Sequence, residues 1–111
     1  MRNVPEQFRM KEGPLASSLD YGNNGAFLVP FESNTLMVIA SDEMDWDHVS
    51  VSLRNRCPNW KEMSFIKDLF FHDTECSIQY NPPKSEYVNN HEYCLHLWRP
   101  QKKDIPLPPS I

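Results

Sequence analysis

Apolar and polar residues alternate most regularly in the segment HVSVSL, residues 48–53. Successive side chains of a β-strand point to opposite faces, so this two-residue period predicts a half-buried strand. Each face takes three side chains, Val49, Val51 and Leu53 on one and His48, Ser50 and Ser52 on the other. The pattern therefore places a histidine and two hydroxyl groups on the polar side of a sheet.

Four other segments have strand composition. Residues 26–30 (AFLVP) and 35–41 (TLMVIAS) flank the polar turn FESN, residues 31–34, and this arrangement predicts a hairpin. The segment 35–41 is nearly all apolar, so we expect both of its faces to be covered. Residues 76–80 (CSIQY) and 93–98 (YCLHLW) supply the remaining two strands.

A helical period appears between residues 59 and 71. Asn59 can cap this helix, and Glu62 can reach back to complete a capping box. The apolar stripe that we expect to be buried consists of Trp60, Met63, Ile66, Leu69 and Phe70. The side chains that we expect in water are Lys61, Glu62, Ser64, Lys67 and Asp68. One amphipathic helix packed on a sheet follows from this stripe.

These elements predict an α+β fold with an antiparallel or mixed sheet of about five strands and one helix on one face. Residues 1–20 lack periodicity and should form an irregular N-terminal arm, with a short helical turn near residues 6–10. Residues 21–100 should form a single domain. Residues 100–111 contain four prolines, and residues 101–111 should form an extended Pro-rich tail.

Composition narrows the classes of function. The 111 residues are 40% hydrophobic and 12% aromatic, which is typical of a globular chain. A net charge of −4 argues against non-specific nucleic-acid binding, which needs a basic surface. No apolar window of about 18 residues occurs, so we expect no contact with a membrane. Three cysteines cannot all pair within the chain, and a reduced cytoplasmic protein without a cofactor is the simplest expectation.

Two histidine–cysteine pairs are close to zinc-binding spacing. They are His72 with Cys76, and His91 with Cys94. Structural zinc sites usually place such pairs on tight turns, whereas Cys94 falls in an alternating apolar strand, where cysteine acts as a small hydrophobe. The favoured alternative is a solvated His72 at a helix C-terminus with inert, buried thiols. We therefore expect no metal.

A second candidate site is a pair of strand histidines. His48 and Ser50 have the His-x-Ser form used by two-histidine phosphoesterases, in which one histidine is the base and the other the acid. His96 could supply the partner, but a tryptophan stands where the second hydroxyl is needed. The alternative is two histidines on the polar face of a sheet. We favour no catalytic role. If the protein is an enzyme, we expect His48, His96 and Ser50 to be its catalytic residues.

The acidic run of residues 42–47 offers oxygen ligands at alternating positions. Its members are Asp42, Glu43, Asp45 and Asp47. Such ligands suit Ca²⁺, but the run lacks the glycine and the bidentate acid of a calcium loop. A solvated connection between strands is the better interpretation.

The segment from Pro82 to Glu92 is longer than a hairpin needs. It is either a binding loop or an Ω-type loop held by its own hydrogen bonds. The polar side chains that we name as binding candidates are Lys84, Tyr87, Asn89, Asn90 and His91, together with Arg99 just beyond the last strand.

Four stretches resemble a family of small proteins encoded by phages and prophages. They are DYGNNGAFLVP, DWDHVSVSLRNRCPNW, IKDLFF and QYNPPKSEYVNNHEYCLHLWRP. The likeness covers roughly residues 18–110, and it is most specific over residues 82–89 and 96–100. It carries no assigned activity. It implies an accessory phage protein that acts in the bacterial cytoplasm.

The sequence thus favours a non-enzymatic protein that binds a host or phage protein. Inhibition of a host defence system, in the manner of an anti-CRISPR protein, is one concrete version. The first alternative is a phosphodiesterase or nucleotide-binding domain that uses His48 and His96. The second is a virion or assembly component. The oligomeric state stays open.

Overall fold

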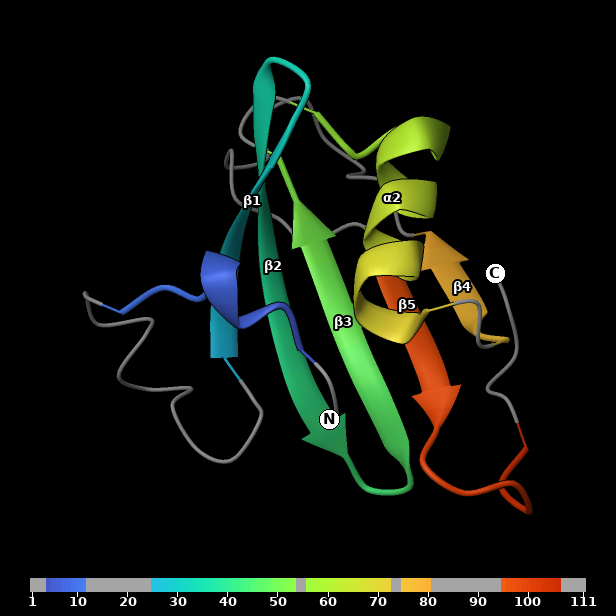
Figure 1. Ribbon diagram of the computed structural model, residues 1–111. Helices are drawn as coiled ribbons and strands as arrows, with labels where there is room; N and C mark the ends of the chain where they lie inside the picture. Colours follow the sequence, from blue (N-terminus) through green and yellow to red (C-terminus); the bar gives the residue numbers. More distant parts are fainter. Residues whose placement is uncertain (1–3, 12–24, 54–55, 73–74, 81–94, 107–111) are drawn as a thin grey trace.

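The computed structural model describes residues 4–11, 25–53, 56–72, 75–80 and 95–106 (Figure 1). The elements in chain order are η1 (Glu6–Phe8), β1 (Gly25–Phe31), β2 (Asn34–Glu43), β3 (Trp46–Ser52), α2 (Trp60–Phe71), β4 (Ser77–Tyr80) and β5 (Leu95–Pro100).

The strands form one five-stranded sheet in the order β1-β2-β3-β5-β4. Every neighbouring pair is antiparallel. α2 lies across one face of this sheet (Figure 1), so the expected α+β architecture is confirmed. β3 and β5 are central neighbours, although α2 and β4 separate them in the chain. Their pairing is therefore the long-range contact that closes the sheet.

The core lies between the sheet and α2. Alternate strand residues supply one side of it: Phe27, Val29, Leu36, Val38, Val49, Val51, Leu95 and Leu97. The helix supplies Met63, Ile66, Phe70 and Phe71. Phe27 and Phe70 meet edge to face with ring centroids 5.2 Å apart. Each large side chain contributes roughly 1.5–3 kcal/mol by leaving water, before the entropy cost of ordering the chain.

Two residues in the first turn of the helix differ in burial from what the sequence predicts. Met63, Ile66 and Phe70 are buried as expected, but Trp60 is 74% exposed. Glu62, which we expected in water, is buried. The period gives the direction of each side chain around the helix axis. It does not say whether the sheet reaches far enough to cover the first turn.

Glu62 is buried because hydrogen bonds satisfy its carboxylate. It accepts from the backbone N–H of Asn59 at 2.8 Å, while its own N–H donates to the Asn59 side chain at 2.9 Å. Arg56 adds two further hydrogen bonds, of 2.6 and 2.9 Å, to the two carboxylate oxygens. The Arg56 hydrogen bond, more than any other contact, holds the pKa of Glu62 below its usual value. The predicted capping box is thus present, with an arginine outside the helix added to it.

The N-terminal segment is partly ordered against the sheet. η1 is a single 3₁₀ turn at the position of the expected helical turn. Arg9 then makes an isolated antiparallel bridge to Phe27, and the N–H of Met10 donates to the carbonyl of Ala26 at 2.8 Å. These contacts cover part of the outer edge of β1.

Two hairpins have two-residue loops. β1 and β2 are joined by Glu32 and Ser33, as the FESN turn predicts, and β2 and β3 are joined by Met44 and Asp45. The acidic run is therefore mostly strand, although Asp42, Glu43 and Asp45 are exposed to solvent as expected. Asp42 and Glu43 end β2, and Asp47, which lies in β3, is buried.

Asp47 is buried on the core side of the sheet, where it is paired with Arg99. The two residues are direct cross-strand partners of β3 and β5. Nη2 and Nε of Arg99 donate to Oδ2 of Asp47 at 2.7 and 3.1 Å, and the side chains are 14% and 7% exposed. The guanidinium carbon also lies 4.7 Å from the centroid of the Phe71 ring, so the pair connects the sheet to the end of α2.

Residues 101–106 turn back onto the β2–β3 hairpin. The N–H of Gln101 donates to the carbonyl of Asp45 at 2.9 Å, and the N–H of Ile105 donates to the carbonyl of Lys102 at 3.2 Å. Nε1 of Trp46 donates to the carbonyl of Pro106 at 3.0 Å. This described part of the tail is therefore tied to the tip of the hairpin.

We expect Met44→Gly to raise the free energy of unfolding. Met44 has φ 57°, a left-handed conformation that costs an L-residue about 1–2 kcal/mol, and its side chain is 87% exposed. Part of the gain is lost because glycine adds entropy to the unfolded chain, which leaves about 0.5–1 kcal/mol. Urea unfolding followed by circular dichroism measures the change. Asp45→Gly, the next residue of the loop, should give no such gain.

We expect Arg99→Met to destabilise the fold strongly, because it leaves the Asp47 carboxylate buried without its cation. The loss should be about 2–4 kcal/mol, near the range for breaking a buried ion pair. The double variant Asp47→Leu with Arg99→Met should recover much of it. Urea unfolding of both variants measures this, and equal losses in the two would contradict the assignment.

Candidate functional site

The face of the sheet away from α2 brings the two candidate histidines together. In the β3–β5 register, Ser50 lies opposite His96, and His48 lies opposite Trp98. His48 and His96 are thus a diagonal pair, a longer span than that between directly opposed residues. The more distant ring nitrogen of His48, Nε2, bridges this span to the nearer one of His96, Nδ1.

Three polar atoms form a small triangle. His48 Nε2 and His96 Nδ1 are 2.9 Å apart. The hydroxyl oxygen of Ser50 lies 3.3 Å from the first and 3.1 Å from the second. The His-x-Ser spacing gives this result because residues two apart on a strand share a face.

The two imidazole rings meet edge to edge. Their planes differ by 9°, and their centroids are 5.1 Å apart. The distance between the centroids exceeds the distance between the two nitrogens by about the width of one ring. The two nitrogens therefore lie between the centroids, nearly on the line that joins them, and point at one another. One nitrogen must carry a hydrogen and the other must accept it. The pair therefore holds one shared proton between the rings.

Trp98 fixes the plane of His48. The two rings stack with centroids 4.0 Å apart and planes 23° apart. Nε1 of Trp98 donates to Oε1 of Gln79 on β4 at 3.1 Å. Because Trp98 is held at both its ring face and its N–H, it limits rotation of the His48 side chain.

Burial, and to a smaller extent the charge interaction with His96, lowers the pKa of His48 to about 4. His48 is therefore neutral at physiological pH. A neutral imidazole can accept a proton or bind a metal ion, whereas an imidazolium can do neither.

The triangle does not have the geometry of a nucleophile–base relay. In a relay the base uses one ring nitrogen for the nucleophile and the other for the group that orients it. Here the same nitrogen of His96, Nδ1, faces both Ser50 and His48. A gap of 2.9 Å between the two nitrogens also leaves no room for a phosphoryl group between them.

Residues 38–102, more than half of the chain, match a family described as a domain of unknown function, DUF7694. The chain belongs to the DUF7694 family. The matched range contains His48, Ser50, His96 and Trp98, and it leaves out β1. No curated protein and no solved structure matches the chain.

Most of the predicted binding loop cannot be placed. Lys84, Tyr87, Asn89, Asn90 and His91 fall inside the DUF7694 range but outside the residues that the structure describes. Arg99 is described, and its guanidinium is engaged with Asp47 in the protein interior.

The zinc candidates are only partly described. His72 is the C-cap of α2, exposed and with φ 48°. Cys76 is a free thiol whose pKa is raised chiefly by burial, which disfavours the thiolate that binds metals. His91 and Cys94 lie outside the described part of the chain. Among the described residues, no three His, Cys, Asp or Glu side chains gather as metal ligands.

Two expectations drawn from composition can also be compared with the structure. Cys57 is disulfide-bonded, so the expectation that all the thiols are free and inert is wrong for this residue. The described part of this DUF7694 chain contains no helix with the length and apolar character needed to cross a membrane.

Sequence reasoning missed Trp98 and Gln79 as parts of the site. The sequence does place Trp98 on the same face as His96, because the two residues are two positions apart on one strand. The contact of Trp98 with His48 depends on the register between β3 and β5. The contact of Trp98 with Gln79 depends on the register between β4 and β5. No local pattern in this DUF7694 sequence encodes those registers.

We expect the stability of the fold to fall as the pH drops from about 6.5 to about 4. His48 is held neutral in the folded state, while its unfolded pKa is near 6.5. The unfolded chain therefore binds the extra proton first, and stability that is present above pH 6.5 is lost toward pH 4. The loss should be about 1–3 kcal/mol, allowing for partial exposure.

Urea unfolding at several pH values measures this loss. Carboxylates also titrate in this window, so the informative quantity is the difference between the wild type and His48→Phe, which retains an aromatic ring against Trp98. This variant should lose the histidine part of the slope, whereas His72→Gln should keep it. Identical slopes in the wild type and His48→Phe would refute the assignment.

Proposed function

We propose that this chain is a non-enzymatic interaction protein whose contact surface includes the end of the molecule at which α2 begins. The observation that carries the proposal is Trp60, which is 74% exposed on the first turn of a helix. Tryptophan is enriched among the residues that dominate binding energy at protein interfaces. An exposed indole on a rigid element is a ready anchor for a partner.

The first turn of α2 is firmly held. Asn59 and Glu62 cap it reciprocally, and Arg56 binds the Glu62 carboxylate through two hydrogen bonds. The position of Trp60 is therefore fixed at the backbone before any partner arrives. A pre-ordered anchor loses less conformational entropy on binding than one on a flexible loop.

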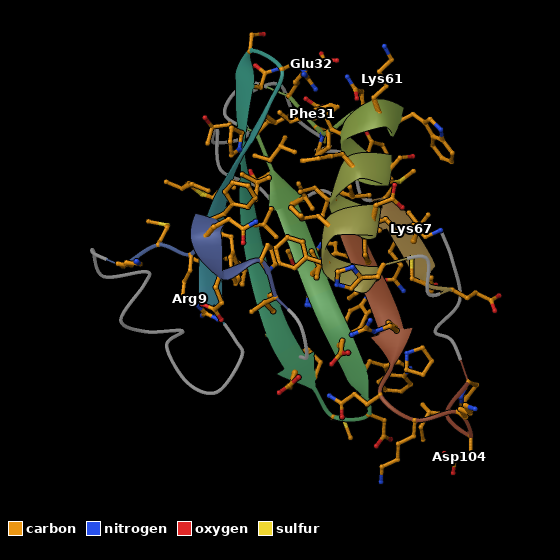
Figure 2. All side chains as sticks on the ribbon, viewed as in Figure 1. Arg9, Phe31, Glu32, Lys61, Lys67 and Asp104 are labelled. Carbon is orange, nitrogen blue, oxygen red and sulfur yellow. The ribbon has the colours of Figure 1, made fainter. Side chains whose placement is uncertain are left out.

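The β1–β2 hairpin lies at the same end of the molecule. Figure 2 shows Phe31 and Glu32 near Lys61, with Asp104 at the opposite end. Phe31 stacks on Phe65 of α2 with ring centroids 4.6 Å apart, which ties the hairpin to the helix. The proposed surface thus joins two elements that are in direct contact.

The partner is proposed from the sequence resemblance. The resemblance favours an accessory phage protein that binds a host or phage protein in the bacterial cytoplasm. Inhibition of a host defence system is the specific role that we propose for this binding. The loop residues Lys84, Tyr87, Asn89, Asn90 and His91 stay predicted contacts. The disulfide at Cys57 counts against the cytoplasmic part, because such bonds are rare in reducing compartments.

A phosphodiesterase or nucleotide-binding domain is the rival proposal. The convergence of His48, Ser50 and His96 favours it. The direct contact between the two nitrogens counts against it, because the substrate phosphoryl group has to lie between an acid and a base. A virion component is the third candidate, and analysis of purified particles by mass spectrometry would identify it.

We expect Trp60→Ala to keep the fold and lose the partner. The side chain is exposed, so the free energy of unfolding should change by no more than about 0.5 kcal/mol. Loss of an anchoring tryptophan should weaken binding by at least about 2 kcal/mol, or roughly 30-fold. Tagged wild-type and variant proteins are used for capture from phage-infected and lysogenic cells, and the captured proteins are quantified by mass spectrometry.

Met44→Ala is the matched control, since it also truncates a large exposed apolar side chain, at the tip of the β2–β3 hairpin. A partner held by the wild type and Met44→Ala but not by Trp60→Ala supports the proposal. Equal capture by all three proteins would remove Trp60 from the interface. Turnover of a cyclic nucleotide or of bis(p-nitrophenyl) phosphate by the wild type, abolished by His48→Phe, would favour the rival.

A further inference from the structure

We propose that His48, His96 and Ser50 form a binding site for a divalent transition metal ion of the Zn²⁺, Ni²⁺ or Cu²⁺ class. The observation that carries this proposal is the triangle of their polar atoms, with sides of 2.9, 3.1 and 3.3 Å. The site is separate from the surface around Trp60, and the inference stands whether or not that surface binds a protein.

The triangle has the size that a metal ion requires. Imidazole nitrogens bind zinc at about 2.0–2.1 Å, so two ligands of one ion lie about 2.9–3.4 Å apart in octahedral or tetrahedral geometry. The distances between the three atoms fall inside that range. An ion beside the triangle can therefore reach both nitrogens and the hydroxyl without movement of the strands, once the two rings have turned toward it.

The number of hydrogens on the two imidazole rings is also compatible with metal binding. When both imidazoles are neutral they carry two hydrogens on four nitrogens, and the facing pair, His48 Nε2 and His96 Nδ1, shares one of them. When a metal ion binds both facing nitrogens, that hydrogen moves to the outer nitrogen of the same ring through solvent. Each ring then has to turn within its own plane, which keeps His48 stacked on Trp98, so that its lone pair turns from the other ring toward the ion. No net proton is released.

The surroundings select a transition metal over a hard cation. Imidazole suits Zn²⁺, Cu²⁺ and Ni²⁺, whereas Ca²⁺ and Mg²⁺ require oxygen ligands. In the described part of this face the one carboxylate is that of Glu43, near the hairpin and hydrogen-bonded to Ser41 at 3.2 Å. Water would complete the coordination shell, so the expected affinity is micromolar and not that of a structural site.

Neighbouring side chains orient the ligands. Trp98 stacks on His48, and Gln79 accepts the indole N–H. Partners that fix the ring plane of a metal ligand typically change metal affinity by about 10–100-fold when they are removed. Gln79→Leu is therefore expected to weaken metal binding less than loss of either histidine.

The test is a titration of the full chain with Zn²⁺ alone, followed by isothermal calorimetry at pH 7.5. We expect one ion per chain for the wild type, at least a tenfold loss of affinity for His48→Phe and for His96→Phe, and no change for His72→Gln. Binding that is equally strong in all four proteins would overturn the proposal, and so would the absence of wild-type binding up to millimolar Zn²⁺.

A second measurement uses only the wild type, in case a variant folds poorly. Paramagnetic Ni²⁺ added to ¹⁵N-labelled protein should broaden the ring resonances of His48 and His96 before those of His72. Broadening that begins at His72 or in residues 101–106 would place the ion elsewhere and contradict the assignment. The ion should also raise the melting temperature, since it binds the folded state selectively.

Discussion

The ion pair between Asp47 and Arg99 is the constraint on which the two faces of the sheet depend. It lies on the core side, between the only two neighbouring described strands that are not consecutive in the chain. A shift of one residue between β3 and β5 would send every side chain of one strand to the other face. A flip of β3 would bury His48 and expose Val49, a flip of β5 would bury His96, and either would separate the two charges. The charge pair therefore fixes a register whose chemistry appears on the opposite side of the sheet.

The division of the sheet into two faces also separates the proposed activities. The core face and α2 hold the molecule together and present Trp60 at one end. The other face carries the His48–Ser50–His96 triangle, stiffened by Trp98 and not by the core. A partner at Trp60 and an ion at the triangle would therefore contact different elements. Coupling between them would have to pass through β3 or β5, the two strands that contribute to both the core and the triangle.

Local patterns predicted the strands, the helix and the hairpin, because each depends on residues close together in the chain. The same patterns failed where a distant residue decides the outcome. Glu62 was expected in water because the capping box does not reveal that Arg56 closes over it. Trp60 was expected in the core because periodicity gives direction and not coverage. The two histidines could each be assigned to a polar face, but their contact is a product of strand register, which the sequence does not display.

The position of β5 in the sheet has a consequence for synthesis of the chain. β1, β2 and β3 form consecutive hairpins and can pair as soon as they leave the ribosome. β5 enters the sheet centre after β3, α2 and β4 have already been made. At typical elongation rates of about 5–20 residues per second, the inner edge of β3 stays unpaired for several seconds. During that interval the nascent chain offers an open strand edge to chaperones or to other unfinished chains.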